Sequence, residues 1–351
     1  MDNHVLIDAV SLRQFTKEVF VAVGLPPDEA DIEAEVLVWA NLRGVDSHGV
    51  QRIPIYVREA RAGRIKVAPD IRVEKETPCL ALLEADHAFG AVVTVQAMEM
   101  AMEKAAQVGI GWVLIRNTSH QGAMGYYPLL AARRDMAGMA WVCGPPNMAP
   151  YGARAAGVHN SPIAIAVPGK THPPLLLDMA TSVAAQGKVT LALDRGVSIP
   201  DTWALDKEGR PTTDPQQAVI MRPAGLYKGS GLAFMFECLS GLMVGNPLIY
   251  PRLMGLDTPP GTQNSVVVAI NIALCTDIEL YKQRVDELAS AIKSLPPAEG
   301  FSEVLVPGEP EDRTAMQRQQ EGIPIPLGTA RRLREVATDL RVSLPPALRA
   351  G

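Results

Sequence analysis

The first part of the chain alternates polar capping residues with amphipathic runs, a pattern that predicts helices. Ser11 precedes apolar residues at helical spacing and Gly24 provides a stop, so we expect a first helix between them. Prolines followed by acidic residues favour the first turn of a second helix, from Pro26 to about Leu42. A third helix is expected over Gly49–Arg61. The N-terminal region is therefore predicted to be helical.

After this region the pattern changes to short aliphatic and β-branched runs bounded by Pro, Gly and Asp, which predict strands. The expected strands are 71–73, 79–83, 112–115, 137–142, 163–167 and a run that begins at 175. Further helices are expected at 92–108, 183–193 and 280–294, followed by a Pro-rich, polar tail. Strands mixed with helices in this way predict an α/β (α+β) fold class.

Composition narrows the class of protein. The 351 residues suffice for two domains, with 47% hydrophobic and 20% charged residues. The net charge of −5 comes without a basic stripe, so we expect no nucleic-acid partner. The four cysteines are scattered in apolar stretches, which favours a reducing cytoplasm. No signal-peptide pattern opens the chain, and Glu237 interrupts its longest apolar run, so we expect neither export nor a membrane span.

The segment from Gly44 to Arg52 contains the strongest chemical signal. Asp46 or Ser47 is expected to cap the third helix, which places His48 and Arg52 on one face, four residues apart. Arg52 could hold a carboxylate bidentately while His48 moves a proton on the neighbouring oxygen. A 2-oxo or 2-hydroxy acid would suit this pair. The alternative is a helix cap beside a surface charge.

Three further segments carry candidate chemistry. His120, in a polar turn after an apolar strand, is a second acid/base candidate, or a histidine satisfied by a carbonyl. Thr181 or Ser182 is expected to cap the helix at 183–193, whose free N–H groups would attract an anion; plain capping explains them equally well. Lys228, within a glycine-rich run, precedes a small-residue helix and could bind phosphate.

Missing motifs exclude several functions. No G-x-G-x-x-G fingerprint follows a strand and no Walker A run occurs, so an ordinary Rossmann domain has no support. The histidines form no close pair on one helix face and have no cysteine partner, so no metal site is expected. No G-x-S-x-G elbow indicates a serine hydrolase.

Taken in order, the segments resemble the type 2 malate/L-lactate dehydrogenases, a group that includes ureidoglycolate, sulfolactate and diketogulonate oxidoreductases and cyclic-imine reductases. The matching stretches are 43–49 with Arg52, 117–127, 161–164, 177–182 with Gly187-Lys188, Lys228-Gly229, 306–310 and 322–326. The resemblance implies a homodimer with a non-Rossmann nicotinamide-binding fold and a largely antiparallel sheet. It places the active site between a helical, substrate-side domain (1–116 with 280–351) and a cofactor-binding sheet domain (117–279).

The resemblance also assigns roles. It implies that His48 is the proton donor/acceptor, Ser47 its hydrogen-bonding partner, Arg52 the carboxylate clamp and His120 a residue at the nicotinamide end. The residues similar to cofactor-contacting positions are His120, Gln121, Gly122, Ala123, Met124, Asp178, Met179, Ala180, Thr181, Ser182, Lys228, Gly229, Pro307, Gly308, Glu309 and Arg313. The cofactor would be NAD or NADP, with a lean toward NAD, since Arg313 could read a 2′-phosphate or simply decorate a helix.

Departures from the usual family pattern bear on the substrate. Asn160 stands where the family usually has Thr, at a position that faces the substrate in some members. Lys188 stands where some imine-reducing members have an acid, and Tyr227 where many members have His. We therefore expect hydride transfer between a nicotinamide and C2 of a small 2-oxo/2-hydroxy acid. The alternatives are a reductase of cyclic imino acids such as piperideine- or pyrroline-2-carboxylate, and a ligand-binding relative without turnover.

Overall fold

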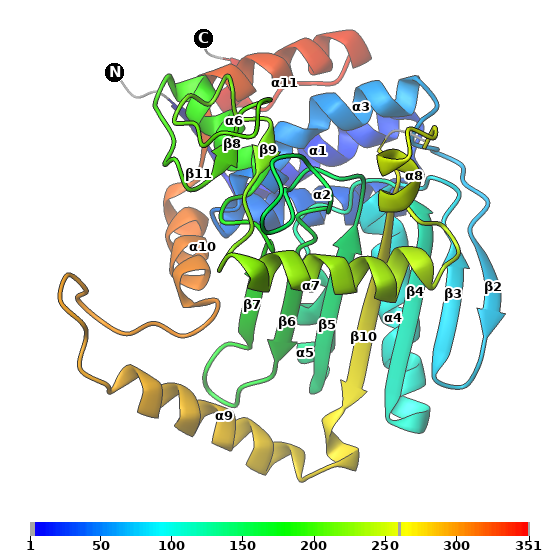
Figure 1. Cartoon of the computed structure of the whole chain (residues 1–351), viewed down its shortest axis with the longest axis vertical. Coiled ribbons are helices and arrows are strands. Elements are labelled where there is room, and N and C mark those ends of the chain that lie inside the picture. The colour runs from blue at the N-terminus through cyan, green and yellow to red at the C-terminus, as the bar shows by residue number, and fades with distance from the viewer. Residues whose placement is uncertain (1–3, 259–260, 350–351) are drawn as a thin grey trace.

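A seven-stranded sheet forms the centre of the molecule, and helices cover both of its faces (Figure 1). The computed structural model describes residues 4–258 and 261–349. In chain order the strands are β1 (His4–Ile7), β2 (Arg72–Glu76), β3 (Leu80–Glu84), β4 (Ile110–Thr118), β5 (Met136–Cys143), β6 (Ile163–Val167), β7 (Leu175–Met179), β8 (Ala204–Leu205), β9 (Ile220–Met221), β10 (Gln263–Asn271) and β11 (Ile323–Pro326).

The helices come from the whole length of the chain. They are α1 (Ala9–Val23), α2 (Pro27–Leu42), α3 (Ile53–Arg61), α4 (Gly90–Val108), α5 (Tyr126–Ala132), α6 (Gln186–Arg195), α7 (Tyr227–Glu237), α8 (Ile249–Leu253), α9 (Ile278–Lys293), α10 (Glu309–Glu321), α11 (Leu327–Leu340) and α12 (Pro346–Arg349). Shorter turns are the 3₁₀ segments η1 (Asp46–His48), η2 (Val50–Arg52) and η4 (Ile272–Leu274) and the π-helical segment η3 (Cys238–Leu242).

The strand order in the large sheet is β2-β3-β4-β10-β5-β6-β7. The pair β3–β4 is parallel, and the other neighbours within this sheet are antiparallel. The expected largely antiparallel sheet and mixed α/β class are thus confirmed. The connection from β3 to β4 runs through α4, because parallel neighbours need a crossover.

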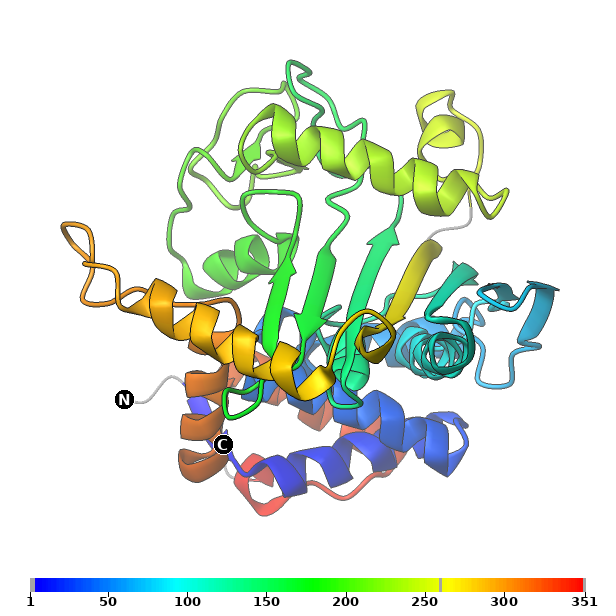
Figure 2. The ribbon, with the colours of Figure 1, turned by 90° about the horizontal axis from the view of Figure 1, so that it is seen from below.

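The helices and the large sheet pack in four layers. Helix α7 crosses one face of the sheet (Figure 2). On this face Phe236 stacks on Trp141 of β5 at 5.5 Å between ring centroids. Helices α4 and α5 cover the other face, and their small residues form a continuous core with β4, β5 and β10. The outer layer is α1, α2, α3 and α11, whose core also includes the small sheet β1–β11. The site lies where this outer layer meets the strand ends.

The helical predictions are confirmed for α2, α4 and α9, with ends within about two residues. The predicted starts of α1, α3 and α6 were wrong. Helix α1 begins at Ala9, because the Asp8 carboxylate accepts the Ser11 N–H at 2.8 Å and caps the helix three residues earlier than predicted. Helix α3 begins at Ile53 and not at Gly49, whose backbone is extended (φ −92°, ψ −153°) between two 3₁₀ turns.

Several elements were not predicted from the sequence, among them β1, α5, α8 and the pair β8–β9, and two other omissions affect the architecture most. Strand β10 lies between β4 and β5 and has the central place in the sheet. The expected polar tail instead forms α10, β11 and α11, and β11 pairs with β1 at the other end of the chain. In β11 the side chains of Ile323 and Ile325 are buried and alternate with prolines, so a short strand is hidden in a Pro-rich pattern.

The sheet takes strands from residue 72 onward, so β2, β3 and β4 share it with β5, β6, β7 and β10. The division into 1–116 with 280–351 and 117–279 remains a prediction. Among residues 4–258 and 261–349, no helix is long and apolar enough to cross a lipid bilayer.

Candidate active site

His48 lies in the turn between α2 and α3. Its Nδ1 is 2.8 Å from Ser47 Oγ, so the predicted hydrogen-bonding pair is present. The Arg52 Nε donates to the Ser47 backbone oxygen at 2.7 Å, which holds His48 and Arg52 in one compact turn. Neither Asp46 nor Ser47 caps a helix here, contrary to the prediction, because each belongs to a 3₁₀ turn that has no side-chain cap.

The Asp46 carboxylate forms its hydrogen bonds with residues other than His48. It accepts from Arg318 Nη1 at 2.7 Å and from Asn41 Nδ2 at 2.7 Å. The Asn41 Oδ1 in turn accepts the Val50 N–H at 2.8 Å. Asp46 therefore anchors the turn to α2 and α10 and is not the charge partner of His48.

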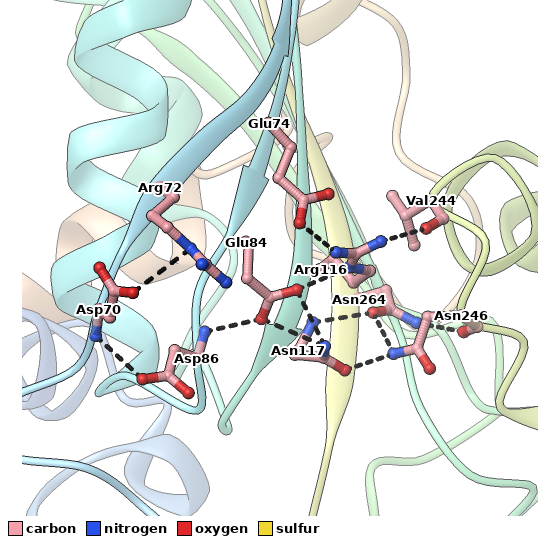
Figure 3. A network of polar contacts seen from close by, with 10 residues as sticks. All are labelled: Asp70, Arg72, Glu74, Glu84, Asp86, Arg116, Asn117, Val244, Asn246 and Asn264. Carbon is pink, nitrogen blue, oxygen red and sulfur yellow. Dashed lines mark hydrogen bonds and ion pairs between the residues drawn. The ribbon is translucent and has the colours of Figure 1, made fainter.

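His120 comes from the loop that follows β4, and a polar network fixes the start of this loop (Figure 3). Asn117 has left-handed backbone with φ +56°, which asparagine tolerates better than most residues. Its side chain donates to Glu84 at 3.0 Å and accepts from Asn246 at 2.6 Å, and its N–H donates to Asn264 at 3.1 Å. These contacts tie β3, β4, β10 and the 244–246 loop together just before His120.

The fold brings the two predicted histidines together. The rings of His48 and His120 stack at 5.5 Å between centroids, with 25° between their planes. Tyr56 Oη lies 2.6 Å from His120 Nδ1, and the Gly122 N–H donates to the same nitrogen at 3.2 Å. A nitrogen that accepts a backbone N–H carries no proton, so Tyr56 donates to it and the His120 proton sits on Nε2.

Tyr56 was missed in the sequence analysis. A signal for it exists, because Tyr56 follows Arg52 at the spacing that separates Arg52 from His48. The spacing of four residues places side chains on one face even where the first turns are 3₁₀. Its partner, His120, is more distant in sequence, so only the folded chain shows the contact.

Both imidazoles are neutral near pH 7. Although part of the His48 ring remains accessible, burial and then the nearby Arg52 charge lower its pKa to about 3. Burial also lowers the pKa of His120 well below its usual value, and Arg52, His48 and His159 add to the shift. Burial and nearby positive charge disfavour imidazolium, so each ring stays neutral, with one nitrogen that can donate a hydrogen bond and one that can accept.

Arg52 itself has a free guanidinium end. Among the described residues, only its Nε has a hydrogen-bond partner, and no carboxylate forms an ion pair with it. A half-buried arginine without an acidic partner is costly unless a ligand supplies the negative charge. This arrangement fits the predicted carboxylate clamp.

Besides the His48 turn and the His120 loop, the loops around α6 and β6 also contribute to the site. Asn160 exchanges hydrogen bonds with Asn147, at 2.8 Å through its N–H and 3.1 Å through its side chain. The Thr181 N–H donates to the Asn160 oxygen at 3.1 Å. A side-chain carbon on Gly187 would approach Ser47 Cβ to 2.3 Å, so the start of α6 lies directly on the His48 turn.

Thr181 and Ser182 do not cap α6, contrary to the prediction. The helix begins at Gln186 after Ala185, and the Ser182 Oγ donates to the Ala184 oxygen at 2.7 Å. The Thr181 hydroxyl is fully buried and has no hydrogen-bond partner among the described residues. Beside it, Gly229 approaches so closely that a side-chain carbon there would lie 2.2 Å from the Thr181 oxygen.

Residues 121–124, predicted to contact the cofactor, are buried in the structure. Gln121 Nε2 donates to Thr94 at 2.6 Å and to Ser265 at 2.8 Å, and the side chains of Ala123 and Met124 join the core. A ligand could therefore contact this segment through its backbone and through His120. Next to the segment, the Gly125 N–H donates to the Asp178 carboxylate at 2.8 Å.

The remaining predicted positions flank this segment. Met179 and Lys228 are exposed, and Ala180 is partly exposed. The Leu176 N–H donates to the Pro307 oxygen at 3.2 Å, and Arg43 reaches the Gly308 oxygen at 3.2 Å, so the start of α10 lies against β7.

Arg313 pairs with Glu303 at 2.7 Å and with Glu309 at 2.6 Å. Both contacts engage the Nη2 end of its guanidinium, and Glu303 holds the Nη1 end as well. Arg313 is therefore a residue of α10 that takes part in a local cluster of ion pairs.

The site has features that fit a nicotinamide dinucleotide. A buried, unpartnered hydroxyl at Thr181, a close glycine at 229 and the adjacent Lys228 offer small, polar surroundings for an anionic group. Within residues 4–258 and 261–349, no group of three His, Cys, Asp or Glu side chains is placed to hold a metal ion.

Comparison with known proteins identifies the class. A sequence profile of the malate/L-lactate dehydrogenase family matches residues 7–334. The chain belongs to this family. The protein is therefore an oxidoreductase, and a dehydrogenase of this family implies a nicotinamide cofactor.

Individual relatives cover nearly the whole chain. The L-sulfolactate dehydrogenase of Methanocaldococcus jannaschii is 39% identical over 331 residues, 93% of this chain and 95% of that protein. The NAD⁺-dependent ureidoglycolate dehydrogenase of Escherichia coli K12 is 36% identical over 321 residues, 91% of this chain and 92% of that protein.

Solved structures agree on the fold. The M. jannaschii sulfolactate dehydrogenase has a TM-score of 0.85 and 36% identity, and the match covers 97% of this chain and 98% of that one. The Δ¹-piperideine-2-carboxylate reductase of Pseudomonas syringae pvar. tomato has a TM-score of 0.81 and 26% identity, with 95% of this chain and 99% of that one covered. The family resemblance inferred from the motifs is confirmed.

Proposed function

We propose that the protein is an NAD(P)-dependent 2-hydroxyacid dehydrogenase that transfers hydride between the nicotinamide and C2 of a small 2-oxo/2-hydroxy acid. The observation that carries this proposal is the Arg52 guanidinium, which has no acidic partner within residues 4–258 and 261–349 and lies beside two neutral imidazoles. A 2-hydroxy acid has a carboxylate that the Arg52 guanidinium can bind and an adjacent hydroxyl that the two imidazoles can contact.

Arg52 holds the substrate carboxylate through its terminal nitrogens, because its Nε is already occupied by the Ser47 oxygen. Burial is the larger cause of the low pKa of both histidines, and the Arg52 charge is the next. The substrate carboxylate neutralises the Arg52 charge, so the basicity of both rings rises when substrate binds. Because of this coupling, proton transfer to the histidines is favoured only when substrate occupies the site.

His48 takes the hydroxyl proton when the hydroxy acid is oxidised and returns it when the oxo acid is reduced. Its low pKa keeps the ring unprotonated in the free enzyme, so that a ring nitrogen is open to the hydroxyl proton, and Ser47 orients the ring through Nδ1. The bound cofactor accepts or supplies the hydride. His120 donates a hydrogen bond from Nε2 toward the substrate oxygen or the nicotinamide end, with its tautomer set by Tyr56 and Gly122.

The cofactor-binding surface is proposed to include His120 with the backbone of 121–124, residues 178–182, Lys228-Gly229 and residues 307–309. We propose NAD over NADP. Arg313 was the candidate reader of a 2′-phosphate, and its pairing with Glu303 and Glu309 supports a structural role instead.

A homodimer is proposed from an exposed apolar surface. Along α7 and α8 the side chains of Tyr227, Phe234, Met235, Tyr250 and Leu253 are each more than half exposed. Several large apolar side chains exposed on neighbouring elements are typical of an interface. The cysteines are free, which accords with the proposed reducing cytoplasm.

The test measures NADH and NADPH oxidation in parallel against pyruvate, oxaloacetate, sulfopyruvate, a larger 2-oxo acid and piperideine-2-carboxylate. We expect turnover of an open-chain acid with NADH preferred. Turnover of the cyclic imine alone would replace the proposal by the imine-reductase alternative. Silence with every substrate, while NADH still binds, would indicate a ligand-binding relative.

A further inference from the structure

A buried glutamate lies beneath the active site. Glu33 of α2 is 1% exposed, and its Oε2 has no hydrogen-bond partner among the described residues. A carboxyl group in such a place is costly, because burial removes the water that would solvate its charge. Within the described chain, no lysine or arginine forms an ion pair with it.

Glu33 contacts the start of α4, and α4 contacts the His120 loop. The Ala91 N–H donates toward the Glu33 carboxyl, and α4 has no cap of its own from Phe89. At the same helix start, a side-chain carbon on Gly90 would lie 2.3 Å from the His120 oxygen. Ser119 Oγ also donates to the Ala88 oxygen at 2.8 Å. The carboxyl and the backbone of His120 thus meet at one helix end.

A second connection runs through Tyr56. Burial raises the pKa of the Tyr56 hydroxyl, and the charge of Glu33 raises it further. The same two causes raise the pKa of Tyr127 on α5. Tyr56 is the residue whose hydroxyl donates to His120 Nδ1, at 2.6 Å. Glu33 is therefore electrostatically coupled to the group that sets the His120 tautomer.

We propose that Glu33 is a positioning residue whose protonation state controls, through Tyr56 and the start of α4, how strongly His120 donates from Nε2. While Glu33 is neutral, Tyr56 and the Gly122 N–H both donate to Nδ1, and His120 keeps its proton on Nε2. When Glu33 loses its proton to solvent, its charge raises the pKa of Tyr56 further, so the hydrogen bond from Tyr56 to Nδ1 weakens and the Nε2–H becomes a weaker donor. The inference rests on the proposed role of His120 in the reaction.

The groups that face this unit are few. Tyr56 on α3 and Tyr127 on α5 lie near Glu33, while Arg52, His48 and His159 act on His120. Arg52 also acts on Tyr56, in the sense opposite to Glu33. Burial raises the pKa of Glu33 itself to about 8, which puts its titration within a range where the enzyme can be assayed.

The experiment follows His120 by ¹⁵N NMR of histidine-labelled, full-length protein from pH 6 to 10, with the signal assigned by its loss in His120→Gln. We expect the wild-type Nδ1 and Nε2 shifts to change with a midpoint near pH 8. Glu33→Gln keeps an acceptor for the Ala91 N–H but has no charge to lose, so its His120 shifts should stay constant. This readout needs no substrate, so its failure is distinct from failure of the proposed reaction.

The matched control is Glu237→Gln. Glu237 on α7 is also buried with a raised pKa, but it accepts from Leu248 and Ile249 on the far face of the sheet. Its replacement should leave the His120 titration unchanged. Persistence of the midpoint in Glu33→Gln would overturn the proposal.

A wild-type measurement covers the case in which the variant does not fold. Infrared difference spectra of the wild type between pH 6 and 10 should show loss of a buried protonated carboxyl. No such band, or constant His120 shifts in the wild type, would also overturn the proposal.

Discussion

His48 and His120 are two histidines of one site, yet different parts of the molecule support them. His48 lies in a 3₁₀ turn of the outer helical layer, where its contacts are local: Ser47 beside it and Arg52 four residues on. His120 lies at the end of a sheet strand, held by contacts from α3, α4 and the Asn117 network. This difference in support is the basis for our proposal that His48 transfers the proton and His120 supplies a fixed hydrogen bond.

The largest effect is expected from His48→Gln, which removes the base but keeps a polar side chain of similar reach. We expect kcat to fall by about 10²- to 10⁴-fold, the usual value of a placed general base. NADH affinity, measured by fluorescence titration, should change little. Near-normal turnover would transfer the proton-transfer role to His120.

The pH dependence offers a sharper test of the same residue. With a pKa of about 3, His48 stays deprotonated in the free enzyme as the pH falls from 8 to 5. The kcat/KM for hydroxy-acid oxidation should therefore show no acid limb near pH 6.5, where an ordinary histidine titrates. A single-proton loss of activity centred near 6.5 would contradict the assignment.

Arg52→Lys comes next. Lysine keeps the charge but loses the planar, bidentate fork, and its ammonium cannot reproduce the Nε contact to Ser47. We expect kcat/KM for the 2-oxo acid to fall by about 30- to 1000-fold, on the order of 2–4 kcal/mol. The effect should appear in KM for the acid and not in the KM for NADH. An equal rise in both would point to a disturbed turn.

The substitution Tyr56→Phe tests the role of His120 without removing a contact of His48. It removes the donor to His120 Nδ1 while the ring keeps its packing against Phe20. We expect a loss of about 10-fold in kcat, the value of one hydrogen bond to a reacting group. The His120 ¹⁵N signals should show a mixed tautomer. Unchanged signals would mean that the Gly122 N–H alone fixes the ring.

The smallest effect is expected from Arg313→Ala. If Arg313 only joins Glu303 and Glu309, the ratio of kcat/KM for NADH and NADPH should change less than about threefold, since exposed ion pairs contribute about 0–1 kcal/mol. Lys228→Ala, at a proposed cofactor position, is the comparison and should weaken both cofactors. A selective loss of NADPH in Arg313→Ala would restore its role as a phosphate reader.

Local sequence patterns predicted the local features well. Proline and acidic residues at Pro27–Glu29 define the start of α2, and Gly24 ends α1 with φ +110°. The pair His48–Arg52 could be found because both residues belong to one short segment. The third helix was extended too far toward its N-terminus, since periodicity continues through the 3₁₀ turns while the hydrogen bonding does not.

Long-range pairing was harder to predict. Strand β10 is a β-branched run, but its place between β4 and β5 depends on partners more than a hundred residues away. The pairing of β1 with β11 joins the two ends of the chain. Loop-closure and sheet order decide such contacts, and no local pattern encodes them.

The sequence by itself determined the family, the start of α2 and the placement of His48 and Arg52 in one short turn. Only the tertiary structure decided that His120 stacks on His48, that Tyr56 donates to His120 and that Glu33 lies beneath them with no ion-pair partner among the described residues. The physical reason is that capping and periodicity act over a few residues. Burial, tautomer and charge, in contrast, depend on which distant segments exclude water from a group.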